Sequence, residues 1–398
     1  MSDYTKSNMC HLPWTGIEIG TSGDYRPCCL YRDPIGDYNA MTHSVSDVMQ
    51  SKEMEQLRED FRKNKRPAGC QSCWKEEAAG KKSKRILLWE KSRTLGELHV
   101  KKEQISTRYL EIRLGNICNL KCRICYPGSS SLWANEAIKL YPEDKEKYLE
   151  INEISRWPRK QNKLFAEIDE VLKNLRYLQI TGGEPLLIQE QFDVLRKCIA
   201  LGVANKIEVH YNTNGTVYPE EALKEIWPHF KRVEIAFSID DIKDRFEYQR
   251  HPAKWDQVNA NIKKISALNL PNISTQICTT LSFFNAYYLD EMAQQVEEWN
   301  PDYWHINCLH LPKRYDVQHL QPYMKNIIVE KLLKCKVRKE EIQTAIGYIK
   351  GGPKYTSDDL LITARNTIKQ IDSVRNEEYQ QVFPEFYNDV LESVGNNQ

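Results

Sequence analysis

Three cysteines near the middle of the sequence form the pattern with the clearest capacity for chemistry. Cys118, Cys122 and Cys125 are separated by three and then two residues, and they follow a short apolar run that predicts a β-strand. Three thiolates this close together can ligate three irons of a [4Fe-4S] cubane, which leaves the fourth iron open to a substrate or cofactor. A zinc ion completed by a distant residue, or three unliganded thiols, is the alternative interpretation.

A second pattern, Thr181-Gly182-Gly183-Glu184-Pro185, begins about sixty residues after the cysteines, at the end of another predicted strand. Glycines at this place allow the backbone to approach a bound ligand closely, and a carboxylate among them can accept hydrogen bonds from an ammonium group. A plain strand-to-helix turn is the alternative, because Gly-Gly and Pro also favour turns.

The first part of the chain holds a second group of cysteines, Cys10, Cys28, Cys29, Cys70 and Cys73. Four thiolates can saturate a second cubane. The offset from a preceding glycine favours Cys28 over its neighbour Cys29, since a hairpin there would present Cys28. Structural zinc on Cys10, Cys28, Cys70 and Cys73 is the alternative, because zinc also takes four thiolates.

The elements that must position these residues follow a regular rhythm after residue 105. Short apolar or alternating runs separated by helical stretches predict β/α units around a parallel sheet. Six units suit a partial (β/α)6 barrel rather than a closed barrel of eight. We expect strands near Tyr109–Leu114, Tyr177–Thr181, Lys206–Asn212, Arg232–Asp240, Ile273–Thr280 and Tyr303–Cys308.

The predicted barrel divides the α/β chain into three parts. Residues 1–100 form a small N-terminal module built around a metal site, residues 105–310 form the barrel, and residues 311–398 form a helical C-terminal region. Helices are predicted at 161–174, 189–201, 218–229, 255–267 and 286–299, and the insertion 126–156 is expected to form helices above the barrel.

One face of the predicted sheet is unusually polar. Side chains alternate along a strand, so the same face collects polar residues from five neighbouring strands. Buried polar groups need partners, and this face therefore indicates a ligand-filled cavity rather than a plain core. Its members are Glu111, Arg113, Gln179, Thr181, Glu208, His210, Asn212, Glu234, Ser238, Asp240, Gln276 and Cys278.

The cysteine pattern and the Gly-Gly-Glu-Pro turn, in this order, resemble the radical S-adenosylmethionine (SAM) superfamily with its CxxxCxxC and GGEP motifs. The resemblance covers about Tyr109 to Leu311. It implies that the three cysteines ligate the SAM-cleaving [4Fe-4S] cluster. Tyr126 is the weakest match, because it follows the last cysteine whereas the family's adenine-bordering aromatic precedes it. Contacts to SAM are implied for Tyr126, Gly182, Gly183, Glu184, Asn212, Ser238 and Arg250.

The N-terminal cysteines resemble the SPASM/twitch extension of the same superfamily, which holds an auxiliary [4Fe-4S] cluster. That region usually follows the barrel, whereas here it precedes the barrel. The further cysteines of a full SPASM domain are absent from the sequence. The resemblance therefore implies one auxiliary cluster, ligated by Cys10, Cys28, Cys70 and Cys73.

The resemblance implies reductive cleavage of SAM to a 5′-deoxyadenosyl radical, which then removes hydrogen from a substrate. We expect a peptide or protein substrate and an electron donor such as flavodoxin or ferredoxin. Oxidation or rearrangement of a small molecule such as a sugar, alcohol or nucleoside is the alternative, and a non-catalytic iron–sulfur redox sensor or scaffold is another. Cys308 could donate a hydrogen atom, with a buried structural cysteine as the alternative.

Composition limits the cellular setting. The 398 residues carry a formal net charge of +1, which gives no reason to expect a nucleic-acid partner. No apolar run is long enough for a membrane span, and the first residues lack the pattern of a signal peptide. Twelve cysteines, eight of them within the first 125 residues, indicate thiolate–metal chemistry in a reducing compartment. We therefore expect a cytoplasmic protein.

Overall fold

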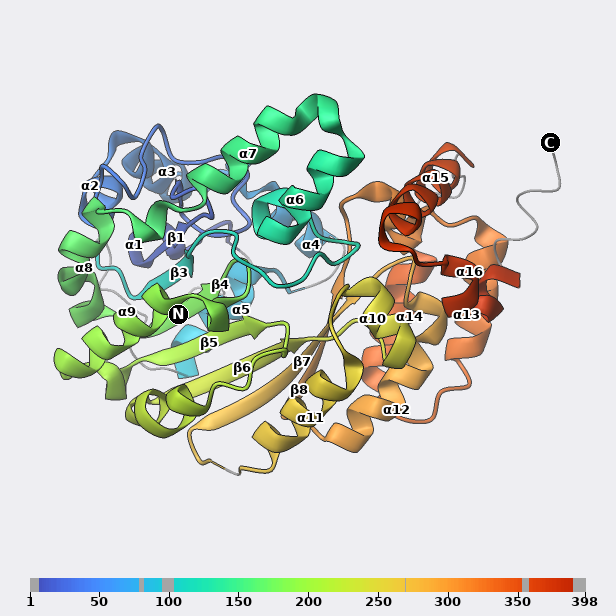
Figure 1. The fold of residues 1–398 in the computed structure, drawn as a ribbon. Helices are drawn as coiled ribbons and strands as arrows, with labels where there is room; N and C mark the ends of the chain where they lie inside the picture. The colour runs from blue at the N-terminus through green and yellow to red at the C-terminus, as the bar shows by residue number, and fades with distance from the viewer. Residues whose placement is uncertain (1–6, 79–81, 95–103, 269, 353–357, 389–398) are drawn as a thin grey trace.

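A single eight-stranded sheet organises the protein (Figure 1). The computed structural model describes residues 7–78, 82–94, 104–268, 270–352 and 358–388. The strands lie in the order β2-β1-β3-β4-β5-β6-β7-β8. The six predicted strands are the consecutive parallel strands β3 Tyr109–Arg113, β4 Tyr177–Thr181, β5 Glu208–Thr213, β6 Arg232–Ser238, β7 Ile273–Leu281 and β8 Tyr303–Cys308. This arrangement confirms the predicted α/β fold.

Two strands from the N-terminal part extend the sheet beyond the predicted six. β1, Gly16–Ile19, pairs in parallel with β3, so that Gly16 lies opposite Tyr109. β2, Tyr25–Arg26, pairs antiparallel with β1 and forms the sheet edge. Strands of four and two residues are too short to show an alternating pattern in sequence. The N-terminal cysteines are thus attached to the same sheet as the barrel.

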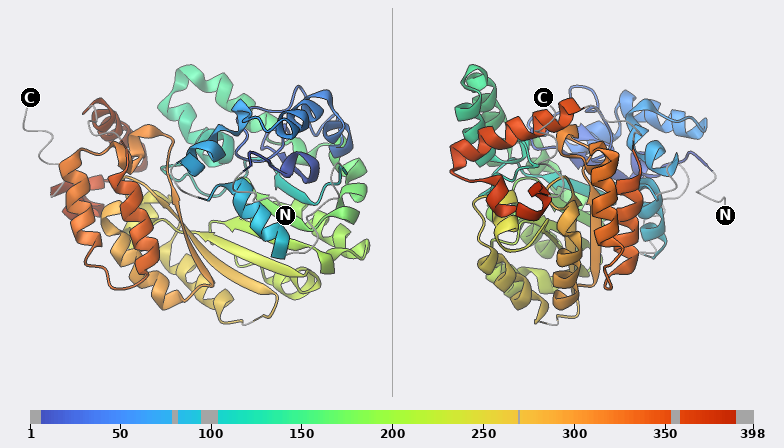
Figure 2. Two further views of the ribbon diagram at one scale, coloured as in Figure 1. Left: turned by 180° about the vertical axis from the view of Figure 1, so that it is seen from behind. Right: turned by 90° about the vertical axis from the view of Figure 1, so that its right-hand side faces the viewer.

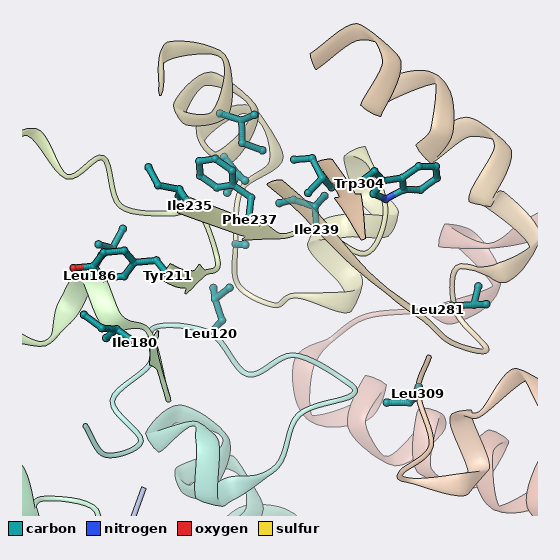
Figure 3. Close-up of a cluster of buried hydrophobic side chains, with 14 of the residues drawn as sticks. Leu120, Ile180, Leu186, Tyr211, Ile235, Phe237, Ile239, Leu281, Trp304 and Leu309 are labelled. Atoms are coloured by element: carbon teal, nitrogen blue, oxygen red, sulfur yellow. The ribbon is translucent and has the colours of Figure 1, made fainter. Parts of the chain in front are cut away.

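Crossover helices cover the outer face of the sheet (Figure 1). Alternate strand residues such as Ile180, Tyr211, Ile235 and Phe237 point towards these helices and form the main hydrophobic core (Figure 3). Where a regular helix was predicted at 218–229, a π-helical turn and a 3-10 turn occur instead. The covering helices are α8 Lys163–Asn174, α9 Gln189–Ala200, α10 Lys243–Gln249, α11 Trp255–Ser266 and α12 Leu289–Trp299.

Residues 45–62 of the N-terminal part form two helices. Ser44 begins α2 with a reciprocal capping box to Asp47, and Ser51 caps the following helix by accepting a hydrogen bond from the Met54 backbone N–H. Two serine caps seven residues apart therefore replace one long helix. The helices of this part are α1 Leu12–Thr15, α2 Val45–Met49, α3 Lys52–Arg62, α4 Gln71–Ala78 and α5 Lys84–Thr94.

The insertion and the C-terminal region are helical, as predicted. Two helices stand in the insertion, α6 Ser131–Leu140 and α7 Lys145–Ile154. The C-terminal region returns to the barrel, since α14 contacts β8 and α15 contacts α6. Its helices are α13 Pro322–Leu332, α14 Lys339–Lys350, α15 Asp358–Arg375, α16 Tyr379–Val382 and α17 Pro384–Phe386. Among the described residues, no helix is long and apolar enough to cross a membrane.

Candidate functional site

The strand register places a row of polar side chains on the inner face of the sheet. Glu18 lies opposite Glu111, which lies opposite Gln179. The row continues through His210 to Glu234, whose carboxylate contacts the His210 ring at 2.5 Å. Glu18 was not predicted, because its strand was not predicted. Five neighbouring strands thus supply a continuous polar surface, which fits a chamber for ligands better than a core.

Helix α5 crosses one part of this inner face. In the view from behind, α5 (cyan) lies in front of the strands (Figure 2). The Lys84 ammonium lies 2.9 Å from the Glu111 carboxylate, and the Lys91 ammonium lies 4.0 Å from the centre of the Tyr177 ring. The Glu111 pKa falls to about 2, because Lys84 and Arg113 outweigh the effect of burial. The N-terminal part therefore supplies a charged wall of the chamber.

The three cysteines of the barrel lie together in the loop after β3, residues 115–130, here called the cysteine loop. All three are partly buried, and the Cys125 backbone N–H donates to the Cys122 carbonyl at 3.0 Å. Burial and the neighbouring sulfur raise the pKa of Cys118 and of Cys125 to about 12. Without a metal these thiols stay protonated, and thiolates at this place require positive charge such as iron provides.

The Gly-Gly-Glu-Pro turn packs directly against the cysteine loop. The Glu184 backbone N–H donates to the Ile117 carbonyl at 2.7 Å, one residue before the first cysteine. A Cβ at Gly183 would lie 2.0 Å from that same carbonyl oxygen, and Gly182 has a φ of +120°. Both glycines are therefore required by the backbone itself. The two sequence motifs are parts of one structural unit.

The Glu184 side chain is enclosed by its own loop and the end of β5. It is fully buried and accepts hydrogen bonds from the Leu186 and Asn214 backbone N–H groups and from the Thr213 hydroxyl, at 2.7 to 3.1 Å. Burial raises its pKa to about 6 despite these three donors. Internal donors thus occupy most of its acceptor positions, and the expected contact to an amino group stays a prediction.

Positive charge lies beside the second cysteine. The Arg250 guanidinium is buried, forms an ion pair with Asp240 at 2.8 Å and lies 3.9 Å from the Cys122 sulfur. Its Nε has no hydrogen-bond partner although it is buried. On the other side of the loop, the Asn214 amide lies 3.9 Å from the Cys118 sulfur. An orphaned guanidinium N–H beside a thiol group is suited to an anionic ligand.

The remaining predicted contacts lie at different depths. Asn212 and Ser238 are partly buried on the inner face near the ends of β5 and β6. Tyr126 is 56% exposed and lies over Gly128. Cys308 lies opposite Leu281 on the helix-covered face of β8 and packs against the core, which favours the structural alternative for this cysteine. Cys278 is the inner-face thiol, paired with Ser238 on one side and His305 on the other.

The C-terminal region holds the cysteine loop through buried ion pairs that the motifs did not predict. Arg375 of α15 donates to the Lys121 carbonyl at 2.7 Å and to the buried Glu136 carboxylate at 2.6 Å. Arg123, which follows Cys122, is fully buried and binds Asp372 at the end of the same helix. Arg123, a charged residue between two cysteines of the motif, is the one sequence signal that could have indicated this contact between α15 and the cysteine loop.

Four N-terminal cysteines surround one small pocket, here called the thiol pocket. Cys10, Cys28, Cys70 and Cys73 line it together with apolar side chains such as Leu12 and Phe61. Burial raises the pKa of each of these thiols, and Arg85 opposes the shift at Cys10 and Cys70. The pocket thus combines a fourfold sulfur donor set with an apolar wall.

Cys29 is not among the residues that line the thiol pocket, although its partner Lys84 is. Its sulfur lies 2.7 Å from the Lys84 ammonium, on the side of the Glu111 carboxylate. The adjacent cysteines Cys28 and Cys29 therefore face two different sites, the thiol pocket and the barrel chamber. This division supports the sequence-based choice of Cys28 over Cys29.

The donor sets of both sites fit iron–sulfur clusters. Among the described residues, no group of three His, Cys, Asp or Glu side chains meets the geometry of a metal-ion site. A cubane takes one cysteine at each of its irons, and four thiolates also suit zinc. The thiol pocket offers four such ligands, and the cysteine loop offers three beside an unpartnered guanidinium N–H.

Comparison with protein families gives two matches. Residues 112–296 match the model of the radical SAM superfamily, and residues 10–74 match the model of the SPASM iron-sulfur cluster-binding domain. The second match lies before the first, as the cysteine pattern predicted. The two matched regions contain the cysteine loop and the thiol pocket respectively.

Curated proteins with detectable similarity share only part of their length with this chain. Molybdenum cofactor biosynthesis protein 1 of Drosophila melanogaster is 30% identical over 191 residues, which is 48% of this chain and 29% of that protein. A GTP 3′,8-cyclase of Aliarcobacter butzleri is 30% identical over 32% of this chain and 33% of its own length. An S-adenosylmethionine-dependent nucleotide dehydratase of a Fibrobacter species is 24% identical, over 49% and 55%.

Solved structures show a more distant likeness. The enzyme anSMEcpe with bound AdoMet has 17% identity and a TM-score of 0.37, with 56% of this chain and 60% of that chain covered. Streptococcus suis SuiB bound to its precursor peptide SuiA has 13% identity and a TM-score of 0.34, over 85% and 66% of the two chains.

Proposed function

Because the chain belongs to the radical SAM superfamily, we propose that it is an enzyme that cleaves SAM and removes hydrogen from a peptide or protein substrate. The family models imply a SAM-cleaving [4Fe-4S] cluster, SAM itself and an auxiliary [4Fe-4S] cluster. When bound, the first cluster supplies the electron that converts SAM into a 5′-deoxyadenosyl radical. The protein's own residues must hold and orient these groups.

The proposal assigns the SAM-cleaving cluster to Cys118, Cys122 and Cys125. Two other segments support the loop that carries them, the Gly182-Gly183 turn through its backbone and α15 through Arg375. This support keeps the three sulfurs in one place while part of the loop stays accessible to a ligand. The observation that carries the proposal is this direct packing of the two motifs into one unit beside the polar chamber.

SAM binding is assigned to groups that surround the loop. The unpartnered Nε of Arg250 can donate to a carboxylate, and the inward-facing Asn212 and Ser238 can hydrogen-bond to hydroxyl groups of the ligand. Tyr126 is exposed enough to cover a base by stacking. Glu184 also acts through the backbone it holds, since internal donors occupy most of its acceptor positions.

The auxiliary cluster is assigned to Cys10, Cys28, Cys70 and Cys73. Four ligands leave no open iron, so this site is suited to electron exchange rather than to substrate coordination. The apolar wall of the thiol pocket restricts access of water to the sulfurs. The pocket adjoins the chamber through the neighbouring residues Cys28 and Cys29, which face the two sites.

A peptide substrate is favoured by the open side of the sheet. β8 is an edge strand, and its inward-facing residues Tyr303, His305 and Asn307 are exposed. An extended chain can enter along such an edge, and a buried small-molecule pocket would not need it. The basic side chains Lys84, Lys91 and Arg113 on the inner face each have a glutamate within 4.0 Å, which disfavours a triphosphate.

A nucleotide is the second candidate substrate. Curated relatives that match about a third to a half of this chain are named for reactions on GTP or on nucleotides. In that case a hydrogen of the ribose or base would be the target, and the polar row from Glu18 to Glu234 would contact the hydroxyl groups. Only the peptide candidate would make use of the exposed edge of β8.

Anaerobic reconstitution with iron and sulfide tests the proposal. We expect about eight irons per chain and formation of 5′-deoxyadenosine from SAM with dithionite. Incubation with candidate peptides encoded beside this gene, and separately with nucleoside triphosphates, followed by mass spectrometry, distinguishes the substrates. Absence of SAM cleavage in a protein loaded with about eight irons would contradict the proposed function.

A further inference from the structure

A positively charged hollow opens on the surface beside the thiol pocket. Its polar lining comes from Arg32, Arg66, Gln71 and Lys75, and it contains no acidic residue. Arg66 and Lys75 are exposed, and the Arg32 side chain is 66% exposed. Asp33 offsets part of the Arg32 charge at 2.8 Å, whereas no ion pair of Lys75 occurs within the described segments. The hollow therefore presents net positive charge to solvent.

One side chain separates the hollow from the thiol pocket. Trp74 lines both cavities and follows Cys73 in the sequence. Its indole N–H donates to the Pro67 carbonyl at 3.3 Å, and the guanidinium groups of Arg66 and Arg85 lie 5.5 and 5.0 Å from the centre of its ring. These contacts hold Trp74 in one orientation. The surface and the sulfur donors are thus joined by a fixed aromatic ring.

We propose that this hollow is the docking surface of a small acidic one-electron carrier protein, which exchanges an electron with the auxiliary cluster. This inference rests on the proposed cluster in the thiol pocket. In each encounter one partner loses one electron and the other gains it, and no bond is formed or broken. Exposed cations attract an acidic surface over a distance and orient it, which suits a short-lived complex.

The arrangement of the cations favours a protein over a small anion. A small anion is usually held by convergent, partly buried donors, whereas here the cations stand on three separated parts of the chain and remain exposed. An extended nucleic acid would need a longer basic stripe than one hollow provides. An acidic protein face matches both the spacing and the exposure of these side chains.

A charge-reversal variant tests the docking surface without relying on enzyme turnover. The variant R32E/R66E/K75E is compared with K224E/K254E/K263E, which reverses three exposed lysines away from the hollow. Binding of a purified acidic flavodoxin to the loaded protein is measured by calorimetry at low and high salt. We expect at least about tenfold weaker binding for the first variant and no loss for the second.

Electron exchange is followed separately. In a C118A/C122A/C125A background, absorbance of the remaining cluster is recorded after mixing with flavodoxin of the opposite oxidation state. We expect R32E/R66E/K75E to slow this exchange at least about tenfold while leaving exchange with dithionite unchanged.

Several results would overturn the inference. The first is unchanged flavodoxin binding by R32E/R66E/K75E, and the second is an equal loss of binding by K224E/K254E/K263E. The third is that R32E/R66E/K75E loses binding to an oligonucleotide but keeps binding to flavodoxin. Thermal unfolding curves check that both variants fold. Failure of the proposed function itself would appear differently, as absence of SAM cleavage with dithionite in the unmodified protein.

Discussion

The thiol pocket and the cysteine loop both gather cysteine sulfurs, but they do so by opposite means. The cysteines of the thiol pocket are spread over about sixty residues of the chain, and apolar side chains surround them. The cysteine loop takes three cysteines from eight consecutive residues and borders a polar chamber. On the proposed assignment, the first arrangement would isolate its cluster from ligands, and the second would expose one. The same donor atom thus serves two purposes through its surroundings.

The largest expected effect separates the two sites by their cysteines. The change C118A should abolish SAM cleavage, because it removes one of only three ligands to the SAM-cleaving cluster. The matched change C70A should remove about four irons but retain part of the SAM cleavage, while the substrate product is lost. Formation of 5′-deoxyadenosine, product and iron content are measured together.

Equal loss of SAM cleavage in the C70A and C118A variants would remove the distinction between the sites. The change C29A is the control for C70A, because Cys29 faces Lys84 and not the thiol pocket. It should leave about eight irons in place.

A second effect tests whether the loop depends on α15. The change R375M removes a fully buried guanidinium from Glu136 and from the Lys121 carbonyl. Breaking a buried ion pair on one side costs about 3 to 5 kcal/mol of unfolding free energy. The control K369M changes an exposed residue of the same helix. Urea denaturation of the metal-free variants gives the comparison.

Iron analysis sharpens the result for Arg375. After reconstitution, R375M should lose iron from the cysteine loop and keep about four irons in the thiol pocket. Loss of iron from the thiol pocket instead would show that α15 supports the thiol pocket and not the cysteine loop.

A third effect concerns pH and arises beside the cysteine loop. Burial raises the pKa of Glu184 from 4.5 to about 6 in the folded protein. The folded state therefore binds more protons than the unfolded state between these values, and this contribution to stability is present below about pH 4.5 and lost as the pH rises through 6. The expected loss is about 2 kcal/mol.

The pH effect is measured as a difference. Urea denaturation of the metal-free protein and of the E184Q variant is compared at several pH values across this interval. The stability of the unmodified protein should fall relative to that of E184Q as the pH rises from 4.5 to 6. Parallel curves would show that burial does not raise the pKa of Glu184.

The smallest effect compares thiol reactivity in the metal-free protein. Cys118 and Cys125 are partly exposed, whereas Cys10 and Cys73 are buried in the thiol pocket. Raised pKa values keep all four protonated near neutral pH, so alkylation should be slow and should accelerate as the pH rises towards 12. Mass spectrometry should find the loop cysteines modified first. Reversed order would indicate that the pocket opens in solution.

The sequence predicted the features that depend on local pattern. The six barrel strands have strong apolar or alternating runs, and the two motifs follow directly from residue spacing. Cys28 could be preferred over Cys29 because the offset from the preceding glycine predicts a hairpin that presents Cys28. The order of the N-terminal module and the barrel was also visible, since the cysteines themselves mark it.

The remaining features depend on contacts between distant segments. β1 is four residues long, so its addition to the sheet and the place of Glu18 leave no periodic signal. Cys308 ends a strand, and only its register with Leu281 shows that it lies on the helix-covered face. The donors to Glu184 leave no local signal either, because Thr213 and Asn214 are 29 and 30 residues away in the sequence.

The ion pairs of Arg123 and Arg375 also have a consequence for the order of assembly during synthesis. Their partners join residues 121–136 to residues 372–377, which leave the ribosome about 240 to 250 residues later. The residues that line the thiol pocket all precede residue 86, and the cluster packed around it also includes Tyr109 and Tyr177, whereas the cysteine loop obtains its last contacts only near the end of translation. The thiol pocket can therefore be assembled before the cysteine loop.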